Sequence, residues 1–350
     1  MVVNVIKKPF ITPKRMNQAI HSQIRLTLLE LSHATKAEIS QRTDISFPTV
    51  SKALEQMEQS GEAVMAGIDE SSGGRRPVRY ALNAEHRYGL GVYLEKEETV
   101  YTVINYRGEA VATLNLPSVL EEGPEAFTAQ LQTVINRYPS IQSVAIGVPG
   151  SVKDGKIFFI PEYEKFSQFD MKAFYEERFN LQVVVENDMN AAVLGYHDLS
   201  RRVDNQTLAY VYLGKNGPGA GILINGDVIR GSTFFSGEVS FVPQYDRYNF
   251  LEAVRKSRQA QQELGKSDEL GDDMIDAMSR LVAALVSIIN PHAVIFCKDD
   301  INRADADKIA LQCAKYVPDT HIPELVISDW KEDYLHGLQR LALHRMMEGL

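Results

Sequence analysis

A cluster of short polar and basic side chains near residue 50 has the chemistry of a surface that reads DNA. Ser46, Thr49 and Ser51 carry hydroxyl groups, which can reach base edges or phosphates in the major groove without a steric barrier. Lys52 can neutralise a phosphate. Phe47 belongs to the same outward-facing set. These residues predict a DNA contact, provided that a single helix presents them on one side.

The surrounding sequence predicts such a helix as the third of three. The first has apolar residues at helical spacing, namely Ile20, Ile24, Leu28 and Leu31. The second begins at Thr35, where the segment Thr35-Lys36-Ala37-Glu38 has the form of a capping box, and extends to about Arg42. Lys36, at its start, is a further candidate for DNA contact. A turn at Thr43-Asp44-Ile45 leads into the third helix.

The third helix is predicted to have Ser46 as its N-cap and Pro48 in its first turn. Its apolar side packs on the first two helices through Val50, Ala53, Leu54 and Met57. This order of elements predicts a helix-turn-helix. A three-helix protein-interaction module with a solvated basic loop is the alternative, but the capped helix, the short turn and the apolar register together favour DNA binding.

A basic wing follows the third helix. Gly61 ends that helix, and Ala63–Met65 and Val78–Ala81 are predicted to form two short strands. The polar loop between the strands leads to Arg75, Arg76 and Arg79. Arginine at such a position can enter the narrow minor groove or hold phosphates, so Arg75 and Arg76 join the predicted DNA-binding residues.

The charge distribution confines this function to the first part of the chain. The 350 residues have a net charge of −9, but residues 1–82 hold 11 Lys/Arg and 8 Asp/Glu, a balance of +3. The remainder holds 26 against 38, a balance of −12. DNA binding should therefore be local and sequence-directed. Two cysteines without metal-ligand spacing, and no apolar run long enough for a signal peptide or membrane span, fit a cytoplasmic protein.

The rest of the chain alternates strands and helices. The predicted strands are Tyr88–Tyr93, Thr99–Asn105, Ser143–Val148, Val183–Val185, Leu208–Leu213 and Gly221–Ile224. The predicted helices are Glu125–Tyr138, Met171–Phe179 and Met274–Ile289. This α/β pattern favours two lobes around a cleft.

The wing also carries a family resemblance. The segment Gly73-Gly74-Arg75-Arg76-Pro77, followed by Tyr80-Ala81-Leu82-Asn83, resembles the winged N-terminal domain of repressors of the ROK family, which also includes sugar kinases. The resemblance extends through nearly the whole chain and implies a two-lobed, actin-like body that holds a sugar or sugar phosphate. It implies an arm at residues 1–15, a winged helix-turn-helix at 16–82, lobes at 86–198 and 199–350, and a C-terminal helix returning to the first lobe.

The resemblance also implies a ligand site. Gly150 matches a glycine beside the sugar, and Asn187 and Asp188 match a pair that in the kinases holds sugar hydroxyls and acts as general base. Glu238 and Glu252 match two glutamates that contact the sugar. Carboxylates and carboxamides suit this task because they hydrogen-bond to neighbouring hydroxyl groups.

The nucleotide and zinc elements of the family are altered. The first phosphate loop reads Tyr93-Leu94-Glu95-Lys96-Glu97, in which two carboxylates stand where phosphate would approach. The second contains Pro218, and the adenosine segment Ile295-Phe296-Cys297-Lys298 lacks paired glycines. No histidine follows Glu238 and no cysteine occurs in residues 242–296, so a tetrahedral zinc site is not expected. We expect no catalytic residue, no cofactor and no metal.

The sequence therefore predicts a sugar-responsive transcriptional repressor that binds an operator as a homodimer or homotetramer. Family resemblance favours release of DNA on ligand binding. A second hypothesis replaces the sugar with a protein partner or a non-sugar metabolite; it is motivated by the missing histidine and by the aromatic and acidic stretch Phe158–Phe169. A third, a sugar kinase with a regulatory head, requires ATP to bind beside Glu95 and Glu97.

Overall fold

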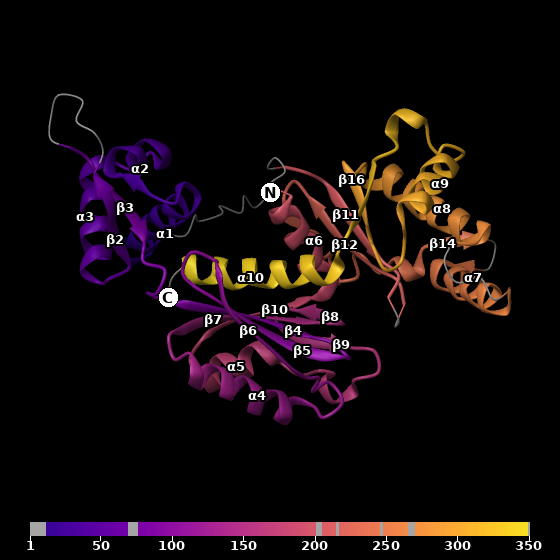
Figure 1. Ribbon diagram of the computed structural model, residues 1–350, viewed down its shortest axis with the longest axis horizontal. Coiled ribbons are helices and arrows are strands. Elements are labelled where there is room, and N and C mark those ends of the chain that lie inside the picture. Colours follow the sequence, from indigo (N-terminus) through magenta and orange to yellow (C-terminus); the bar gives the residue numbers. More distant parts are fainter. Residues whose placement is uncertain are drawn as a thin grey trace, which may run out of the picture.

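The chain forms a small N-terminal head and a larger body of two lobes (Figure 1). The computed structural model describes residues 12–68, 76–200, 205–214, 217–245, 248–264 and 270–348. Each lobe is built on a five-stranded sheet with helices packed on it. The predicted α/β body with two lobes is thereby confirmed.

The head has three helices, α1 (Pro13–Leu31), α2 (Lys36–Thr43) and α3 (Phe47–Gln59). Its sheet has the strand order β1 (Ala34–Thr35), β3 (Val78–Leu82) and β2 (Ala63–Ile68). Its core includes Ile24, Leu28, Val50, Leu54 and Met57, each at most 1% exposed. Two helices joined by a three-residue turn and followed by the β2–β3 hairpin give the element order of a winged helix.

Local sequence accounts for most helix ends in the head. The predicted capping box is confirmed, because Glu38 N donates to Thr35 Oγ1 at 3.2 Å and Thr35 N donates to the Glu38 carboxylate at 2.7 Å. Ser46 occupies the N-cap of α3, but its hydroxyl makes no capping bond and lies 2.8 Å from Thr49 Oγ1. Leu31 was expected on the packed face of α1; it is the last residue of the helix and is 40% exposed.

The first lobe contains β10 (Gln182–Asn187), β7 (Ile141–Val148), β4 (Tyr88–Leu94), β5 (Glu98–Ile104) and β6 (Ala110–Pro117), in that order. The first three strands are parallel, whereas β4, β5 and β6 are joined antiparallel. Helices α4 (Pro124–Arg137) and α5 (Met171–Phe179) cover one face. Phe127, Leu131 and Tyr175 are buried there.

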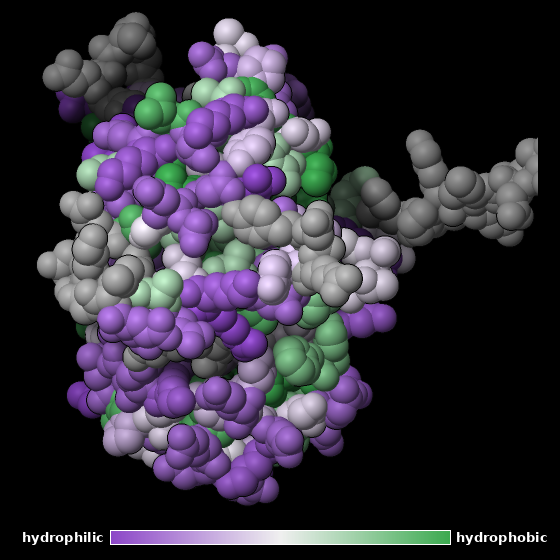
Figure 2. Space-filling model, turned by 90° about the vertical axis from the view of Figure 1, so that its right-hand side faces the viewer, coloured by the Kyte–Doolittle hydropathy of each residue, from purple (hydrophilic) through white to green (hydrophobic). Residues whose placement is uncertain are grey.

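The second lobe contains β13 (Asp227–Val228), β12 (Gly219–Ile224), β11 (Leu208–Tyr212), β16 (Ala293–Cys297) and β17 (Glu324–Ser328), in that order. Helices α7 (Phe250–Leu264), α8 (Asp272–Ile289) and α9 (Arg303–Cys313) pack on its outer face. The surface on this side of the molecule is mostly hydrophilic, with small hydrophobic areas between (Figure 2).

Two helices lie between the sheets: α6 (Asp188–Leu199) and α10 (Trp330–Glu348) (Figure 1). They cross with their backbones in contact, since a Cβ on Gly195 would lie 1.8 Å from Asp333 O and one on Gly337 would lie 1.9 Å from Ala191 O. α10 packs on the first sheet and α6 on the second. The C-terminal end of α10 reaches the head, where Ser22 Oγ of α1 donates to Met347 O at 3.0 Å.

Short elements complete the fold. β8 (Ser151–Lys153) pairs with β9 (Lys156–Phe159), and β14 (Pro243–Tyr245) pairs with β15 (Tyr248–Asn249). Single 3-10 turns occur at Glu164–Phe166, Val239–Phe241 and Asp319–His321. Over the ranges that the structure describes, no helix is long and apolar enough to cross a membrane.

Candidate functional site

The outer face of α3 carries the side chains predicted to read DNA. The exposed members are Ser46, Phe47 and Lys52, and the half-buried ones are Thr49 and Ser51. Phe47 is 52% exposed although it is a large apolar residue. The opposite side of the helix is buried in the head. α3 therefore presents one continuous polar face, with an aromatic ring at its start.

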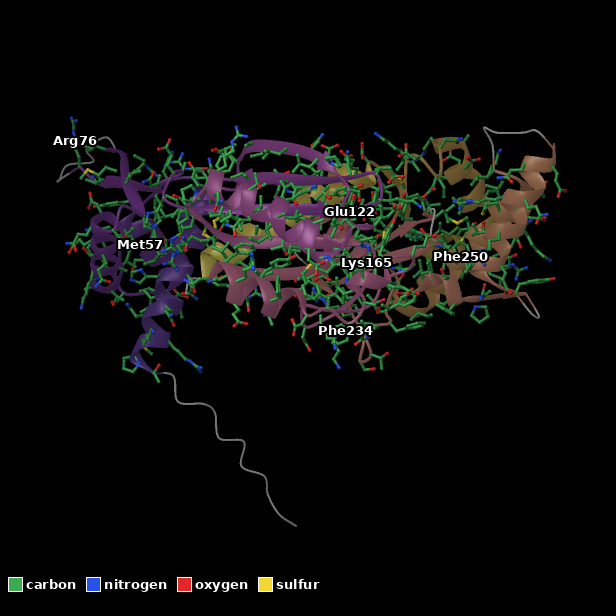
Figure 3. All side chains as sticks on the ribbon, turned by 90° about the horizontal axis from the view of Figure 1, so that it is seen from below. Met57, Arg76, Glu122, Lys165, Phe234 and Phe250 are labelled. Atoms are coloured by element: carbon green, nitrogen blue, oxygen red, sulfur yellow. The ribbon has the colours of Figure 1, made fainter. Side chains whose placement is uncertain are left out.

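The basic residues of the head fall into two groups. Arg76 is exposed and points outward at the end of the head farthest from the body (Figure 3), whereas Arg75 lies outside the described residues. Lys36 is half-buried, and its Nζ donates to Ser51 Oγ at 2.8 Å. Arg79 was expected to project from the wing, but it donates to Glu38 Oε1 at 3.0 Å and so ties β3 to α2. The ion pair explains why that expectation is wrong.

A cleft of about 970 Å³ opens between the two lobes. It lies at the carboxyl ends of parallel strands from both sheets, where ligands of open α/β sheets commonly bind. Gly150, Asn187, Asp188 and Glu238 all line it, so the structure brings together four of the five predicted ligand residues. Whether they bind a ligand remains a prediction.

Asn187 is occupied by contacts within the protein. Its Oδ1 caps α6 by accepting from Met189 N at 3.0 Å and Asn190 N at 3.1 Å. Its Nδ2 donates to Gly150 O at 3.0 Å and to Asp188 Oδ1 at 2.7 Å. These four bonds use the full capacity of the amide. The geometry therefore makes Asn187 a residue that fixes the position of Asp188 in the cleft.

Asp188 and Glu238 face the cleft from opposite lobes. Burial raises the pKa of Asp188 to about 7, and burial also raises the pKa of Glu238. Ser151 Oγ of the first lobe donates to Glu238 Oε1 at 3.4 Å. A second contact between the lobes pairs Arg230 with the buried Glu186. Two polar contacts thus join the two lobes at the cleft.

Glu252 does not reach the cleft. It lies in the first turn of α7, and its carboxylate accepts from Asn249 N at 2.9 Å while Glu252 N donates to Asn249 Oδ1 at 2.9 Å. This reciprocal pair is a capping box. The neighbouring Leu251 lines the cleft instead. The family resemblance therefore pointed to a helix that borders the cleft, but the Glu252 side chain caps the N-terminus of this helix.

Acidic side chains from the β4–β5 hairpin and from the segment after β16 line the cleft. Glu95 N donates to Glu98 O at 3.2 Å, which closes the β4–β5 hairpin and removes that donor. Leu213 N donates to Asp300 Oδ2 at 2.8 Å, so a carboxylate occupies a backbone donor of the second loop. Asp299 also lines the cleft. Asp299 and Asp300 directly follow the segment whose missing glycines were noted in the sequence.

Three aromatic side chains form a floor of the cleft between the end of β4 and the end of β11, and no local sequence pattern predicted it. The Tyr212 and Trp330 rings are stacked with centroids 4.4 Å apart and an interplanar angle of 14°. Tyr93 lies 6.1 Å from Trp330, at 61°. All three residues line the cleft. They come from β11, β4 and the start of α10, and only the fold places them together.

The aromatic stretch that motivated a protein partner is mostly internal. Tyr163 and Phe166 are buried in the core of the first lobe. Phe159 is 58% exposed and lies at the cleft. The two cysteines, Cys297 and Cys313, are free and buried. In the described part of the chain, no group of three histidine, cysteine, aspartate or glutamate residues is placed to hold a metal ion.

A head with the element order of a winged helix, followed by a two-lobed α/β body with a cleft between the lobes, defines the architecture of this chain. Residues 90–247 match the ROK family, and the chain therefore carries a ROK family domain. The solved structure of a ROK family transcriptional regulator, described as a homologue of the E. coli MLC protein, has a TM-score of 0.70 at 16% identity; the alignment covers 94% of this chain and 99% of that one.

Both repressors and kinases occur among the relatives of this chain. The xylose repressor of Bacillus spizizenii (strain W23) is 27% identical over 236 residues, covering 65% of this chain and 60% of that protein. A beta-glucoside kinase of Listeria innocua serovar 6a is 28% identical over 142 residues, covering 40% of this chain and 48% of the kinase. The chain spans 55% to 60% of the length of the first xylose repressors it matches.

Proposed function

We propose that this protein is a sequence-specific transcriptional repressor of carbohydrate genes in the cytoplasm, whose DNA affinity changes when a sugar or sugar phosphate binds between the lobes. The observation that carries the proposal is the course of α10. This helix begins in the cleft at Trp330 and ends against α1 of the head at Met347. One helix therefore contacts both the cleft proposed to hold the ligand and the head proposed to bind DNA. The similarity to xylose repressors supports both roles.

The DNA contact is proposed to involve the exposed face of α3 in the major groove and Arg75 and Arg76 at the wing. Two heads in a dimer or tetramer would read half-sites separated by about one helical turn, roughly 34 Å, or a multiple of it. A change in lobe closure would alter that spacing. The cleft ligand would contact Asp188 and Glu238, with Gly150 allowing close approach and Asn187 holding Asp188.

A buried joint connects the head to the body. Arg25 Nε of α1 lies 2.5 Å from Glu62 Oε1, which also accepts from Tyr106 OH of the first lobe at 2.6 Å. Arg25 Nη1 donates to Met347 O at 3.3 Å. The joint thus connects α1, the residue before β2, the first lobe and the end of α10. We propose that it transmits movement of α10 to the head.

We also propose that the protein is not a kinase. Phosphate groups of ATP would meet Glu95, Asp299 and Asp300, and two backbone donors of the phosphate loops are already occupied. The negative charges of these carboxylates and of the phosphate groups repel each other, which opposes nucleotide binding. Because a kinase occurs among the relatives, the proposed absence of kinase activity calls for a direct test.

Two measurements on the full chain test the proposal. A thermal-shift screen of sugars and sugar phosphates, with and without ATP and magnesium, identifies the ligand class. Retention of DNA from the protein's own upstream region is then measured with and without the sugar that stabilises most. We expect a sugar to raise the melting temperature and lower DNA retention. Stabilisation by ATP with phosphate transfer would refute the regulatory assignment; retention that no carbohydrate alters would favour a protein partner or other metabolite.

A further inference from the structure

The charges that line the cleft are unequally compensated. Seven acidic and four basic side chains line it among the described residues. Each of the four bases has an acidic neighbour: Lys96 with Glu162, Arg230 with Glu186, Arg258 with Asp300 and Lys331 with Glu98. Among the described residues, every basic side chain that lines the cleft therefore already has an acidic neighbour.

Three of the cleft carboxylates lack a basic neighbour. Glu95, Asp188 and Glu238 have no lysine, arginine or histidine partner within 4.0 Å in the described ranges. Burial and the neighbouring Asp188 carboxylate raise the pKa of Glu95 well above its ordinary value. Carboxylates in a water-poor site need a cation or several donors to remain charged.

Two residues that line the cleft carry buried polar atoms without hydrogen-bond partners among the described residues. Glu95 Oε1 and Trp330 Nε1 are both buried and have no hydrogen-bond partner among the described residues. Trp330 is only 8% exposed, and its ring forms the aromatic floor with Tyr93 and Tyr212. A buried acceptor and donor left without partners are uncommon in native proteins and indicate a missing ligand group or water. The faces of aromatic rings additionally attract cations.

We infer that this subsite, formed by Glu95, Asp188 and the aromatic floor, binds a positively charged amino group on the effector, so that the ligand is an aminated sugar. The inference rests on the proposed function and specifies its ligand class. An ammonium group supplies three donors and one positive charge, which would compensate the two carboxylates. A neutral hydroxyl group would leave both carboxylates without a counter-charge. A phosphate would face Glu95 and Asp188, and no described basic side chain of the cleft lacks an acidic neighbour, so a sugar phosphate is disfavoured.

Isothermal titration of the full chain tests this with four probes: glucose, 2-amino-2-deoxyglucose, 6-amino-6-deoxyglucose and glucose 6-phosphate. Glucose and each amino sugar differ only in the group on one carbon atom. The difference in their affinities therefore isolates the contribution of the charged amino group. We expect at least one amino sugar to bind about tenfold or more tightly than glucose, and glucose 6-phosphate to bind most weakly.

The variant Glu95→Gln keeps the size of the side chain and removes its charge. It should reduce the affinity for the amino sugar about tenfold and leave that for glucose nearly unchanged. Glu122→Gln, an exposed glutamate of the first lobe, is the matched control and should change neither. A melting temperature at or above that of the wild type verifies that Glu95→Gln is folded.

The outcomes separate the inference from the proposed function. Glucose binding as tightly as both amino sugars, or unchanged amino-sugar binding by Glu95→Gln, overturns the inference and leaves a sugar-responsive regulator in place. Tightest binding of glucose 6-phosphate also overturns it. If none of the four probes binds while the protein retains its upstream DNA, the inference and the sugar cleft both fail.

Discussion

The buried joint between Arg25 and Glu62 should contribute strongly to the stability of the head on the body. Arg25 is 8% exposed and Glu62 is 4% exposed, so each depends on the other for its charge. Removing one partner of a buried ion pair costs about 3–5 kcal/mol. The variant Glu62→Gln keeps the shape and some hydrogen bonding, and we therefore expect a loss near the lower limit, about 3 kcal/mol.

The assay is guanidinium unfolding followed by two signals. Trp330 is the only tryptophan of the chain and reports on α10 and the cleft through its fluorescence. Far-ultraviolet circular dichroism reports on all helices, including those of the head. Glu30→Gln is the control, since Glu30 pairs with Arg42 on the surface, where both side chains are more than half exposed. This exposed pair should contribute at most about 1 kcal/mol.

The same joint predicts the sign of a pH dependence. Burial alone would raise the pKa of Glu62, but hydrogen bonds from Arg25 and Tyr106 lower it below the ordinary glutamate value. Its stabilisation is therefore full above that value, about 4.3, and is lost as the pH falls through the lower folded-state pKa. The difference between wild type and Glu62→Gln should persist at neutral pH and close only in acid. An effect of Glu62→Gln no larger than that of Glu30→Gln at neutral pH would refute the reasoning.

Three further predictions concern the head, the helix crossing and the nucleotide half of the cleft. Lys52→Ala should weaken DNA binding and reduce the slope of log affinity against log salt by about 1, whereas Lys308→Ala on α9 should change neither in a retention assay over several salt concentrations. Gly337→Ala should destabilise the body by about 1–3 kcal/mol in guanidinium unfolding, because the new Cβ would lie 1.9 Å from Ala191 O; an unchanged midpoint would mean that α6 and α10 separate without cost. Millimolar ATP with magnesium should leave the melting temperature unchanged, because Asp300 occupies the Leu213 N–H; a shift of several degrees would contradict the acidic-cleft argument.

Sequence reasoning succeeded where the signal is local. The Thr35 and Glu38 capping box, the helix Met171–Phe179 and the buried face of α3 all depend on residues within one or two turns of each other. The paired strands at the start of the body were also predictable from their apolar runs. In these cases propensity and burial indicate the same structure.

The predictions that were wrong or missing concern side chains whose role is set by other parts of the chain. Arg79 pairs with Glu38, 41 positions earlier, and nothing in the wing sequence indicates that partner. Glu252 matches a ligand position, yet the preceding Asn249 converts it into a helix cap. The stacking of Trp330 on Tyr212 requires α10 to return between the lobes over 100 residues later in the chain. Such side-chain roles follow only from the three-dimensional arrangement.

The central claim is that a ligand in the cleft controls the head. The most direct test measures the affinity of the full chain for its upstream DNA by fluorescence anisotropy, with and without the most stabilising sugar, for wild type and Asp188→Ala. We expect the sugar to weaken wild-type DNA binding about fivefold or more, a coupling of at least about 1 kcal/mol, and Asp188→Ala to bind DNA without responding to the sugar. An equal response of both proteins would contradict the claim that Asp188 and its cleft form the ligand site.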